Sequence, residues 1–238
     1  MKKILLLQFR SIKTSQHEVE CILRAMEIEK LQMDVINVTE GDKLQQLNNL
    51  KDYSGVIFGA SSDYYISNLD NEVREKLMSV KPIVDYLIEQ DIPTLGICFG
   101  HQLLCLLAGG KVESDAIQTE GGIVKIKLNE IALKARLFEG IDNEFLIVSG
   151  HKDSVTQLPK NAILLAQTEK TINSIIQIKN NIYGIQQHPE LDVDGLVWRL
   201  TLFPEYQRGR SLDDIKSEFA DMPYAKKLME NFRKIVNI

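Results

Sequence analysis

The sequence lacks the features that mark membrane, exported and disulfide-bonded proteins. Its 238 residues contain no apolar run long enough to span a bilayer. The run that follows Lys3 ends at Gln8, too early for the apolar region of a signal peptide. There are only 3 cysteines, an odd number at irregular spacing, which argues against a disulfide framework. We therefore expect a protein of the reducing cytoplasm with no membrane contact.

Clustered positive charge is also missing. The formal net charge is −5, and the 28 Lys and Arg residues are scattered instead of forming the basic stripe that phosphate backbones need. No CxxC pair and no HExxH motif occurs, so we expect no metal and no cofactor. Hydrophobic residues make up 44% of the chain, as in ordinary globular domains, which excludes disordered and fibrous classes. Nucleic acid is not an expected partner.

The apolar pattern divides the chain into three regions. Up to Ile97, short apolar runs such as "YSGVIFGAS" alternate with stretches of helical spacing, which is typical of a mostly parallel sheet covered by helices on both faces. From Gly121 onward strands follow one another, and 192–238 reads as helical. We predict one α/β domain, residues 1–238, with an open, mostly parallel sheet, a β-rich second half and a helical C-terminal extension. Helices are expected over Glu18 to Lys30, Leu44 to Leu50 and Glu72 to Gln90.

The stretch "LGICFGHQLL" places Cys98 between two glycines where a strand gives way to a helix. G-x-C-x-G is the form of a nucleophile elbow, a strained turn that lifts its central side chain clear of the sheet. The glycines are needed because a Cβ there would clash with neighbouring backbone. The helix N-terminus favours a thiolate, and the amide of Phe99 would point at the attacked atom. The alternative is a buried, unreactive thiol, which is our expectation for Cys21 and Cys105.

A nucleophilic thiol needs an imidazole partner, and the sequence offers four histidines. His188 is favoured because Pro189 keeps it out of the helical region and holds the segment extended. Glu190, two residues further on, then projects to the same side and can bind one ring nitrogen. The other ring nitrogen is left for Cys98.

The remaining histidines offer alternatives. His151 and Asp153 have the same spacing after the strand "EFLIVSG", so this pair stays open as a base. His101 lies one helical turn after Cys98, but no carboxylate in the local sequence would orient it. His17 lies near the start of a polar helix, and we expect it to be a solvated surface residue.

Attack on a carbonyl also needs donors for the oxyanion. Gly59 ends the run "GVIFG" and lies where elbow enzymes place the loop that supplies an amide besides that of Phe99. We predict an oxyanion hole formed by the amides of Gly59 and Phe99.

These motifs together resemble the class I, or triad-type, glutamine amidotransferases, in particular free-standing relatives of the GMP synthase glutaminase domain. "PTLGICFGHQLL", "VSGHKDSV" and "YGIQQHPE" occur in the order and spacing of that family, and the resemblance covers Met1 to about Leu191. It implies a flavodoxin-like glutaminase fold. It also implies Cys98 as nucleophile, His188 as base and acid, and Glu190 as the carboxylate that orients His188.

The resemblance further implies substrate contacts. Gln102 matches the residue that contacts glutamine after the elbow. Ser149, Gly150 and His151 match the loop that holds the α-carboxylate of the substrate. One segment departs from the family: its oxyanion loop is commonly Gly-Gly-Pro, whereas residues 59–61 here are Gly-Ala-Ser.

The reaction implied is hydrolysis of the glutamine side-chain amide to glutamate and ammonia through a γ-glutamyl thioester, with ammonia passing to an unidentified synthase. Two alternatives remain. Plant γ-glutamyl peptidases share a similar "GICFGHQ" motif, so the substrate could be a γ-glutamyl peptide. A catalytically silent binding or regulatory module with the same fold is the other.

Overall fold

A computed structural model describes residues 3–41, 44, 50–207, 209–219 and 222–238. Most of the helix expected over Leu44 to Leu50 lies outside the described residues. Eleven strands are described: β1 (Lys3–Gln8), β2 (Met33–Asn37), β3 (Tyr53–Phe58), β4 (Thr94–Ile97), β5 (Lys111–Ser114), β6 (Glu120–Leu128), β7 (Glu144–His151), β8 (Asp153–Gln157), β9 (Ala162–Gln167), β10 (Ile175–Ile178) and β11 (Ile182–Ile185).

Within the described ranges, nine of these strands form one open sheet in the order β2-β1-β3-β4-β11-β10-β9-β6-β7. The first five pair in parallel. From β11 to β7 each neighbouring pair is antiparallel. The open α/β sheet is therefore as predicted, but it is mixed rather than mostly parallel, because the β-rich second half extends the same sheet. Strands β5 and β8 pair separately.

The helices are α1 (Ile12–Met26), α2 (Asn71–Met78), α3 (Lys81–Gln90), α4 (Phe99–Leu107), α5 (Val193–Leu202), α6 (Leu212–Phe219) and α7 (Pro223–Val236), with short 3₁₀ turns at Lys30–Gln32, Leu50–Asp52, Ile66–Asn68, Ala132–Lys134, Arg136–Phe138 and Pro204–Gln207. The helix expected over Glu18 to Lys30 begins earlier and ends at Met26, because Glu27 adopts a left-handed conformation with φ 52°. The helix expected over Glu72 to Gln90 is two helices.

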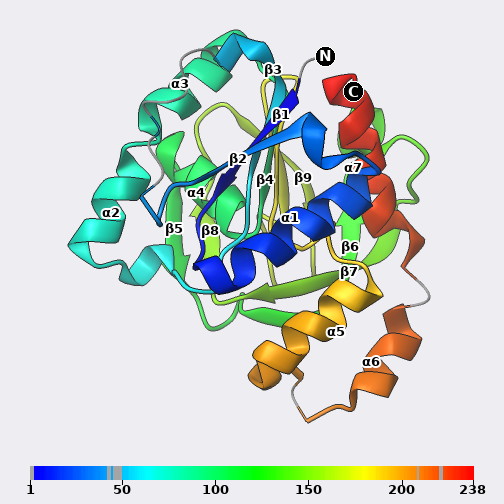
Figure 1. Ribbon diagram of the computed structural model, residues 1–238. Coiled ribbons are helices and arrows are strands. Elements are labelled where there is room, and N and C mark those ends of the chain that lie inside the picture. Colours follow the sequence, from blue (N-terminus) through cyan, green and yellow to red (C-terminus); the bar gives the residue numbers. More distant parts are fainter. Residues whose placement is uncertain (1–2, 42–43, 45–49, 208, 220–221) are drawn as a thin grey trace.

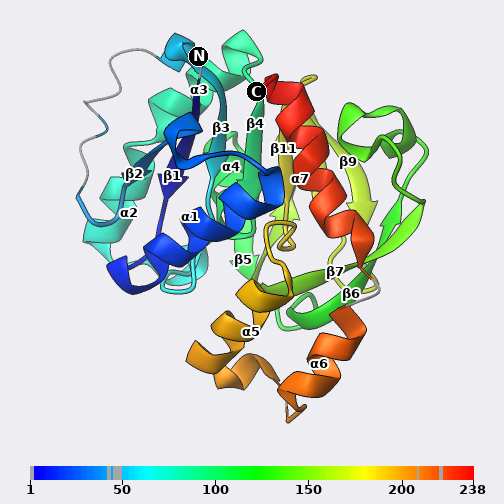
Figure 2. The same cartoon turned by 45° about the vertical axis from the view of Figure 1, so that its right-hand side comes forward.

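Helices cover both faces of the parallel part of the sheet (Figures 1 and 2). Alternate residues of β1 show the two layers. Ile4 and Leu6 pack in one cluster with residues of α1 and α7, whereas Leu5 and Leu7 pack in another with residues of α3 and α4. A strand buried on both sides needs apolar residues at every position, which explains the continuous run in β1.

Residues 192–238 divide between two places. Helix α7 packs against α1 in the main core, near the two chain ends at the top of Figure 1. Helices α5 and α6 lie at the opposite end of the molecule, at the bottom of Figure 1. The parallel strands run from the first end toward the second, so α5 and α6 lie beside the carboxyl edge of the sheet, where sites of open α/β proteins form.

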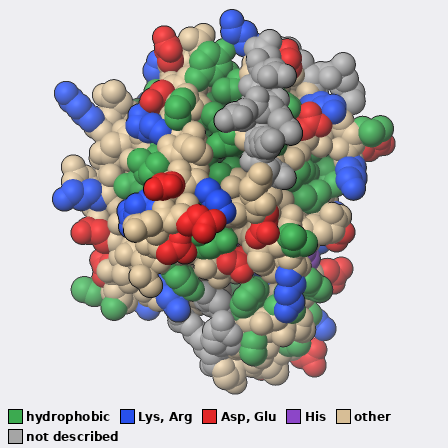
Figure 3. Space-filling model, turned by 60° about the vertical axis from the view of Figure 1, so that its left-hand side comes forward, with side chains coloured by type: hydrophobic (Ala, Val, Ile, Leu, Met, Phe, Trp, Pro, Cys, Tyr) green, Lys and Arg blue, Asp and Glu red, His purple; other side chains and the backbone are tan. Residues whose placement is uncertain are grey.

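The surface of the described residues shows no segregation of charge on the face in Figure 3, where Lys and Arg side chains are interspersed with Asp and Glu. Among the described helices, none has the length and apolar character needed to cross a bilayer.

Candidate active site

Cys98 lies at the turn between β4 and α4 in a conformation that L residues rarely adopt, with φ 48° and ψ −104°. The two flanking glycines permit this turn. A Cβ on Gly96 would come within 2.8 Å of the Gly100 carbonyl oxygen, and a Cβ on Gly100 would run into the carbonyl of Phe58 on β3. The close approach of α4 to the sheet therefore requires glycine on both sides of Cys98.

The Cys98 side chain is buried but meets polar groups. Its sulfur lies 3.8 Å from the Gly150 carbonyl oxygen and 3.6 Å from Nε2 of Gln186, and it is near enough to His188 to raise the pKa of that imidazole. Cys105 has a different environment, because burial in the apolar core raises the pKa of its thiol. Of the three thiols, Cys98 is the one in contact with an imidazole at the carboxyl edge of the sheet; the Cys21 thiol lies beside His17 under α5.

His188 and Glu190 form the expected pair. Nδ1 of His188 lies 2.9 Å from Oε1 of Glu190, whose side chain is fully buried. The main-chain amide of His188 donates to the Val148 carbonyl of β7, which anchors the segment against the sheet. Burial alone would lower the pKa of His188, but Glu190 and Cys98 raise it to about 9. At neutral pH the imidazole is therefore a protonated donor held between a carboxylate and a sulfur.

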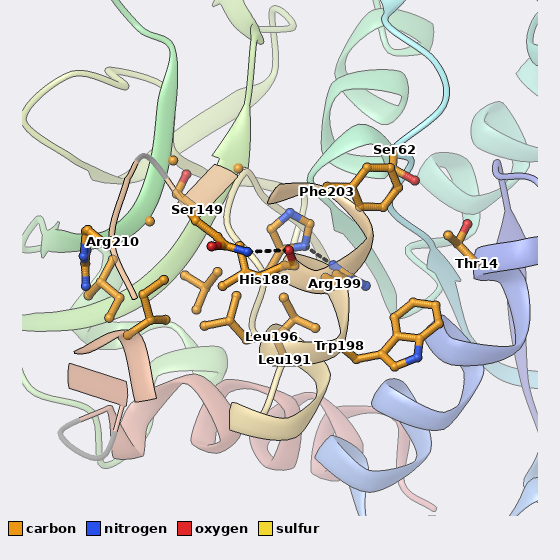
Figure 4. Close-up of a pocket in the computed structure, with 18 of the residues that line it drawn as sticks. Thr14, Ser62, Ser149, His188, Leu191, Leu196, Trp198, Arg199, Phe203 and Arg210 are labelled. Carbon is orange, nitrogen blue, oxygen red and sulfur yellow. Dashed lines mark hydrogen bonds between the residues drawn. The ribbon is translucent and has the colours of Figure 1, made fainter. Parts of the chain in front are cut away.

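Arg199 of α5 completes this cluster. Its Nη2 lies 3.0 Å from Oε1 of Glu190, and its Nη1 lies 3.1 Å from Nδ1 of His188 (Figure 4). Burial would raise the pKa of Glu190, but His188 and Arg199 lower it to about 2, so the carboxylate stays ionised. Sequence reasoning missed Arg199, since the surrounding "VWRL" shows only helical spacing.

The alternative base pair is not assembled. Nδ1 of His151 faces the main-chain carbonyl of Asp153 at 2.9 Å, while the Asp153 carboxylate accepts hydrogen bonds from the amide and hydroxyl of Ser67. Nε2 of His151 lies 3.2 Å from the Thr171 hydroxyl and 3.6 Å from Glu120. The side chain of His151 is thus directed toward β6 and the loop before β10, and His151 is not among the residues that line the pocket described below.

The other two histidines are also structural. His101 is fully buried beside Cys105, and burial lowers its pKa to about 3. The expectation that His17 is solvated is wrong: its ring stacks on Trp198 with centroids 3.9 Å apart. Because α5 covers this part of α1, burial lowers the pKa of His17 to about 4.

The predicted oxyanion loop needs a correction. The Gly59 amide donates to the Leu7 carbonyl at 2.9 Å and so continues the pairing of β3 with β1. The next amide, that of Ala60, donates to the Glu18 carboxylate at 2.7 Å. Phe99 is the first residue of α4, so its amide has no acceptor within the helix. Gly59 instead gives space to Glu18, whose carboxylate oxygens would lie within 3 Å of a Cβ there.

A pocket adjoins His188 between the sheet edge and the α5–α6 segment (Figure 4). Ser149 and Gly150, two of the predicted substrate contacts, are among the residues that line it. Gln102 does not: it is buried, and its Nε2 donates to the Asp153 carbonyl at 2.6 Å and to Oε1 of Gln186 at 3.1 Å. Other lining residues are Arg10, Thr14, Ser61, Ser62, Gly121, Gly122, Ile123, Val148, Leu191, Leu196, Trp198, Arg199, Leu200, Phe203, Gln207, Arg210 and Ile215.

No group of three or more His, Cys, Asp or Glu side chains within the described ranges is placed to hold a metal ion. The polar groups of the site are instead arranged for acid–base and nucleophilic chemistry.

Fold and site together define a class: an open α/β protein with a cysteine at a strand-to-helix elbow beside a His–Glu pair. Comparison with known proteins gives the family. The model of the glutamine amidotransferase class-I family matches residues 19–194, and the chain belongs to this family of enzymes.

Individual relatives agree with this assignment. The chain is 32% identical to a glutamine-hydrolyzing GMP synthase subunit of Methanosphaera stadtmanae, over 74% of this chain and 82% of the relative. It is also 32% identical to gamma-glutamyl peptidase 5 of Arabidopsis thaliana, over 84% of this chain and 75% of the relative. A crystal structure of a glutamine amidotransferase from Thermotoga maritima has a TM-score of 0.81 at 18% identity, covering 100% of this chain and 99% of that one, which shows the shared fold.

Proposed function

We propose that the chain hydrolyses the side-chain amide of glutamine to glutamate and ammonia through a γ-glutamyl thioester on Cys98. The observation that carries the proposal is the contact of His188 with both Cys98 and Glu190 at a strained elbow. A buried thiol kept only for packing would need neither the strained backbone nor an imidazole held by a carboxylate.

The proposed reaction has two steps. The Cys98 sulfur attacks the amide carbon, the carbon–nitrogen bond breaks, and Nε2 of His188 gives its proton to the nitrogen, which leaves as ammonia. Neutral His188 then takes a proton from water, the hydroxide attacks the thioester, and glutamate and the Cys98 sulfur are released. Glu190 stays ionised and orients the imidazole throughout.

The amide of Phe99 is the proposed oxyanion donor. Loss of one such donor costs on the order of 3 kcal/mol in the barrier. Gln102 is proposed to act by its position, because its amide group ties Asp153 to Gln186, which in turn contacts the Cys98 sulfur.

The relatives bear on the fate of the ammonia and on the substrate. One relative is named as part of a synthase, so we propose a separate ammonia-accepting synthase as the partner. A second candidate function is hydrolysis of γ-glutamyl peptides, the activity named for the Arabidopsis relative. Leu196, Leu200 and Phe203 line the same pocket as His188 and favour this second candidate. Their apolar side chains suit the amino acid that leaves a γ-glutamyl peptide, whereas the ammonia that leaves glutamine has no apolar group to contact them.

The test is a glutaminase assay on purified wild-type and variant proteins, run beside γ-glutamyl peptide assays. Cys98→Ala and His188→Asn should each lower kcat by on the order of 10³-fold or more, whereas His151→Asn should cost less than about tenfold. A glutamine-mimicking chloroketone should leave an adduct on Cys98 in the mass spectrum. The absence of both turnover and adduct would favour a silent module, and activity on peptides alone would favour the second candidate.

A further inference from the structure

The end of β11 brings a buried glutamine to the Cys98 sulfur. Strands β4 and β11 lie side by side and pair in parallel, with Ile97 opposite Ile185 (Figure 2). Cys98 and Gln186 directly follow these two residues, and the Cys98 amide donates to the Ile185 carbonyl at 2.8 Å, so the pairing continues to the elbow. The Gln186 side chain is fully buried, and its Nε2 lies 3.6 Å from the Cys98 sulfur. The proposed reaction steps do not use this contact.

A chain of hydrogen bonds that starts at a main-chain carbonyl fixes the direction of the Gln186 amide group. The Asp153 carbonyl can only accept, so the end of Gln102 that meets it at 2.6 Å is the donor Nε2. The same Nε2 lies 3.1 Å from the Gln186 amide group, whose facing atom must then be the acceptor Oε1. The donor end of Gln186 is therefore the end that faces the sulfur.

The Cys98 sulfur thus has a partner for each of its two states. A thiol can donate to the Gly150 carbonyl oxygen, 3.8 Å away. A thiolate can only accept, and Gln186 supplies a donor that carries no charge of its own. The charged group that faces the sulfur is His188, with Glu190 and Arg199 paired behind it. Because a hydrogen bond to an ionised group is stronger than one to a neutral group, the Gln186 donor favours the thiolate.

We propose that Gln186 is a catalytic residue that donates a hydrogen bond from Nε2 to the Cys98 thiolate, and that Gln102 is the residue that positions it. The inference rests on the proposed function, since it concerns the nucleophile of the same reaction. In the first step the donor keeps the sulfur ionised until it attacks the amide carbon. In the second step the carbon–sulfur bond breaks, its electron pair returns to the sulfur, and the same donor stabilises the thiolate that leaves.

The test measures the reactivity of Cys98 without a substrate. Iodoacetamide, an uncharged alkylator, reacts with the thiolate, so its rate on the Cys98 peptide in the mass spectrum reports the ionised fraction at each pH. Gln186→Met removes the donor at similar volume. It should move the half-maximal pH of alkylation up by about one unit, with an about tenfold lower rate on the acid side. Gln186→Glu keeps the shape but places a carboxylate beside the sulfur, and it should move the profile further in the same direction. Gln102→Met lets the Gln186 amide turn, and it should move the profile by less.

Gln187→Met is the matched control. Gln187 is the next residue and is equally buried, but its Oε1 accepts from the Ser174 hydroxyl at 2.8 Å. The control should leave the alkylation profile of Cys98 unchanged, whatever it does to the melting temperature. Equal shifts in Gln186→Met and Gln187→Met would trace the effect to packing and overturn the proposal.

Two further outcomes separate this proposal from the proposed function. If wild-type protein hydrolyses glutamine but Gln186→Met and Gln186→Glu alkylate with the wild-type profile, the assignment of Gln186 as donor fails alone. If wild-type protein shows no turnover of glutamine but the Gln186 variants still shift the profile, the proposed function fails while the donor to the thiolate stands.

Discussion

At the scale of single residues, Arg199 is the cation that lies against the His188–Glu190 pair. Nδ1 of His188 donates a hydrogen bond to Oε1 of Glu190, and the guanidinium of Arg199 forms an ion pair with the same oxygen. A positive charge at this distance opposes protonation of the imidazole, and it also fixes the carboxylate that orients the ring. Arg199 is therefore a positioning residue that acts through Glu190 and His188.

This role predicts a change in the pH profile. Arg199→Met should raise the pKa of His188 further above about 9, because Glu190 would no longer share its charge with a cation. The basic limb of kcat/KM against pH should move up by roughly one unit, while kcat falls because the ring is less well held. Arg199→Lys should keep the limb in place. If Arg199 only fastened α5 to the sheet, Arg199→Met would lower the melting temperature and leave the limb where it was.

At the scale of elements, helix α1 holds the loop that follows β3. Both oxygens of Glu18 are used: one accepts from the Ala60 amide at 2.7 Å and the other from Nε2 of Gln8 at 3.0 Å. The same carboxylate forms an ion pair with Arg10 at 2.9 Å, and both side chains are almost fully buried. Nε of Arg10 in turn donates to the Ala60 carbonyl. The loop geometry beside Cys98 is thus set by a helix from the start of the chain.

Removing the charge of Glu18 should lower both the unfolding free energy of the protein and kcat for glutamine. Glu18→Gln leaves the Arg10 guanidinium buried without its counter-ion, a change that costs about 3 to 5 kcal/mol of unfolding free energy. The loosened loop should also lower kcat for glutamine. Glu20→Gln, at an exposed position of the same helix, should stay within about 0.5 kcal/mol of wild type. Urea denaturation measures both, and equal midpoints for the two variants would contradict this account.

At the scale of the whole molecule, features set by neighbouring residues could be predicted from the sequence, and features set by distant contacts could not. Cys98, His188 and Glu190 could be identified from sequence because each owes its geometry to immediate neighbours: glycines in one case, a proline in the other. The partner of the Gly59 amide could not, because it depends on the register of β1 against β3. Arg199 comes from helix α5, whose docking on the sheet edge leaves no mark in local spacing. The mixed sheet has the same origin, since antiparallel strands were foreseen but not their place in the order.

The coupling of the active site to the stability of the whole fold gives the last prediction. The pKa of His188 is raised from 6.5 to about 9 in the folded protein, so its contribution is complete below pH 6.5 and is lost as pH rises through 9. The pKa of Glu190 is lowered from 4.5 to about 2, so its contribution to the unfolding free energy is present above pH 4.5 and is lost as pH falls through 2.

The difference in unfolding free energy between wild type and His188→Asn should therefore shrink from pH 6.5 to about pH 9. kcat/KM for glutamine should fall over the upper part of the same range, because the imidazolium is the proposed donor to the leaving nitrogen. Chemical denaturation at a series of pH values, with His151→Asn as the control histidine variant, measures the first effect. A constant difference across the range would mean that His188 is neutral in the folded protein and cannot serve as that donor.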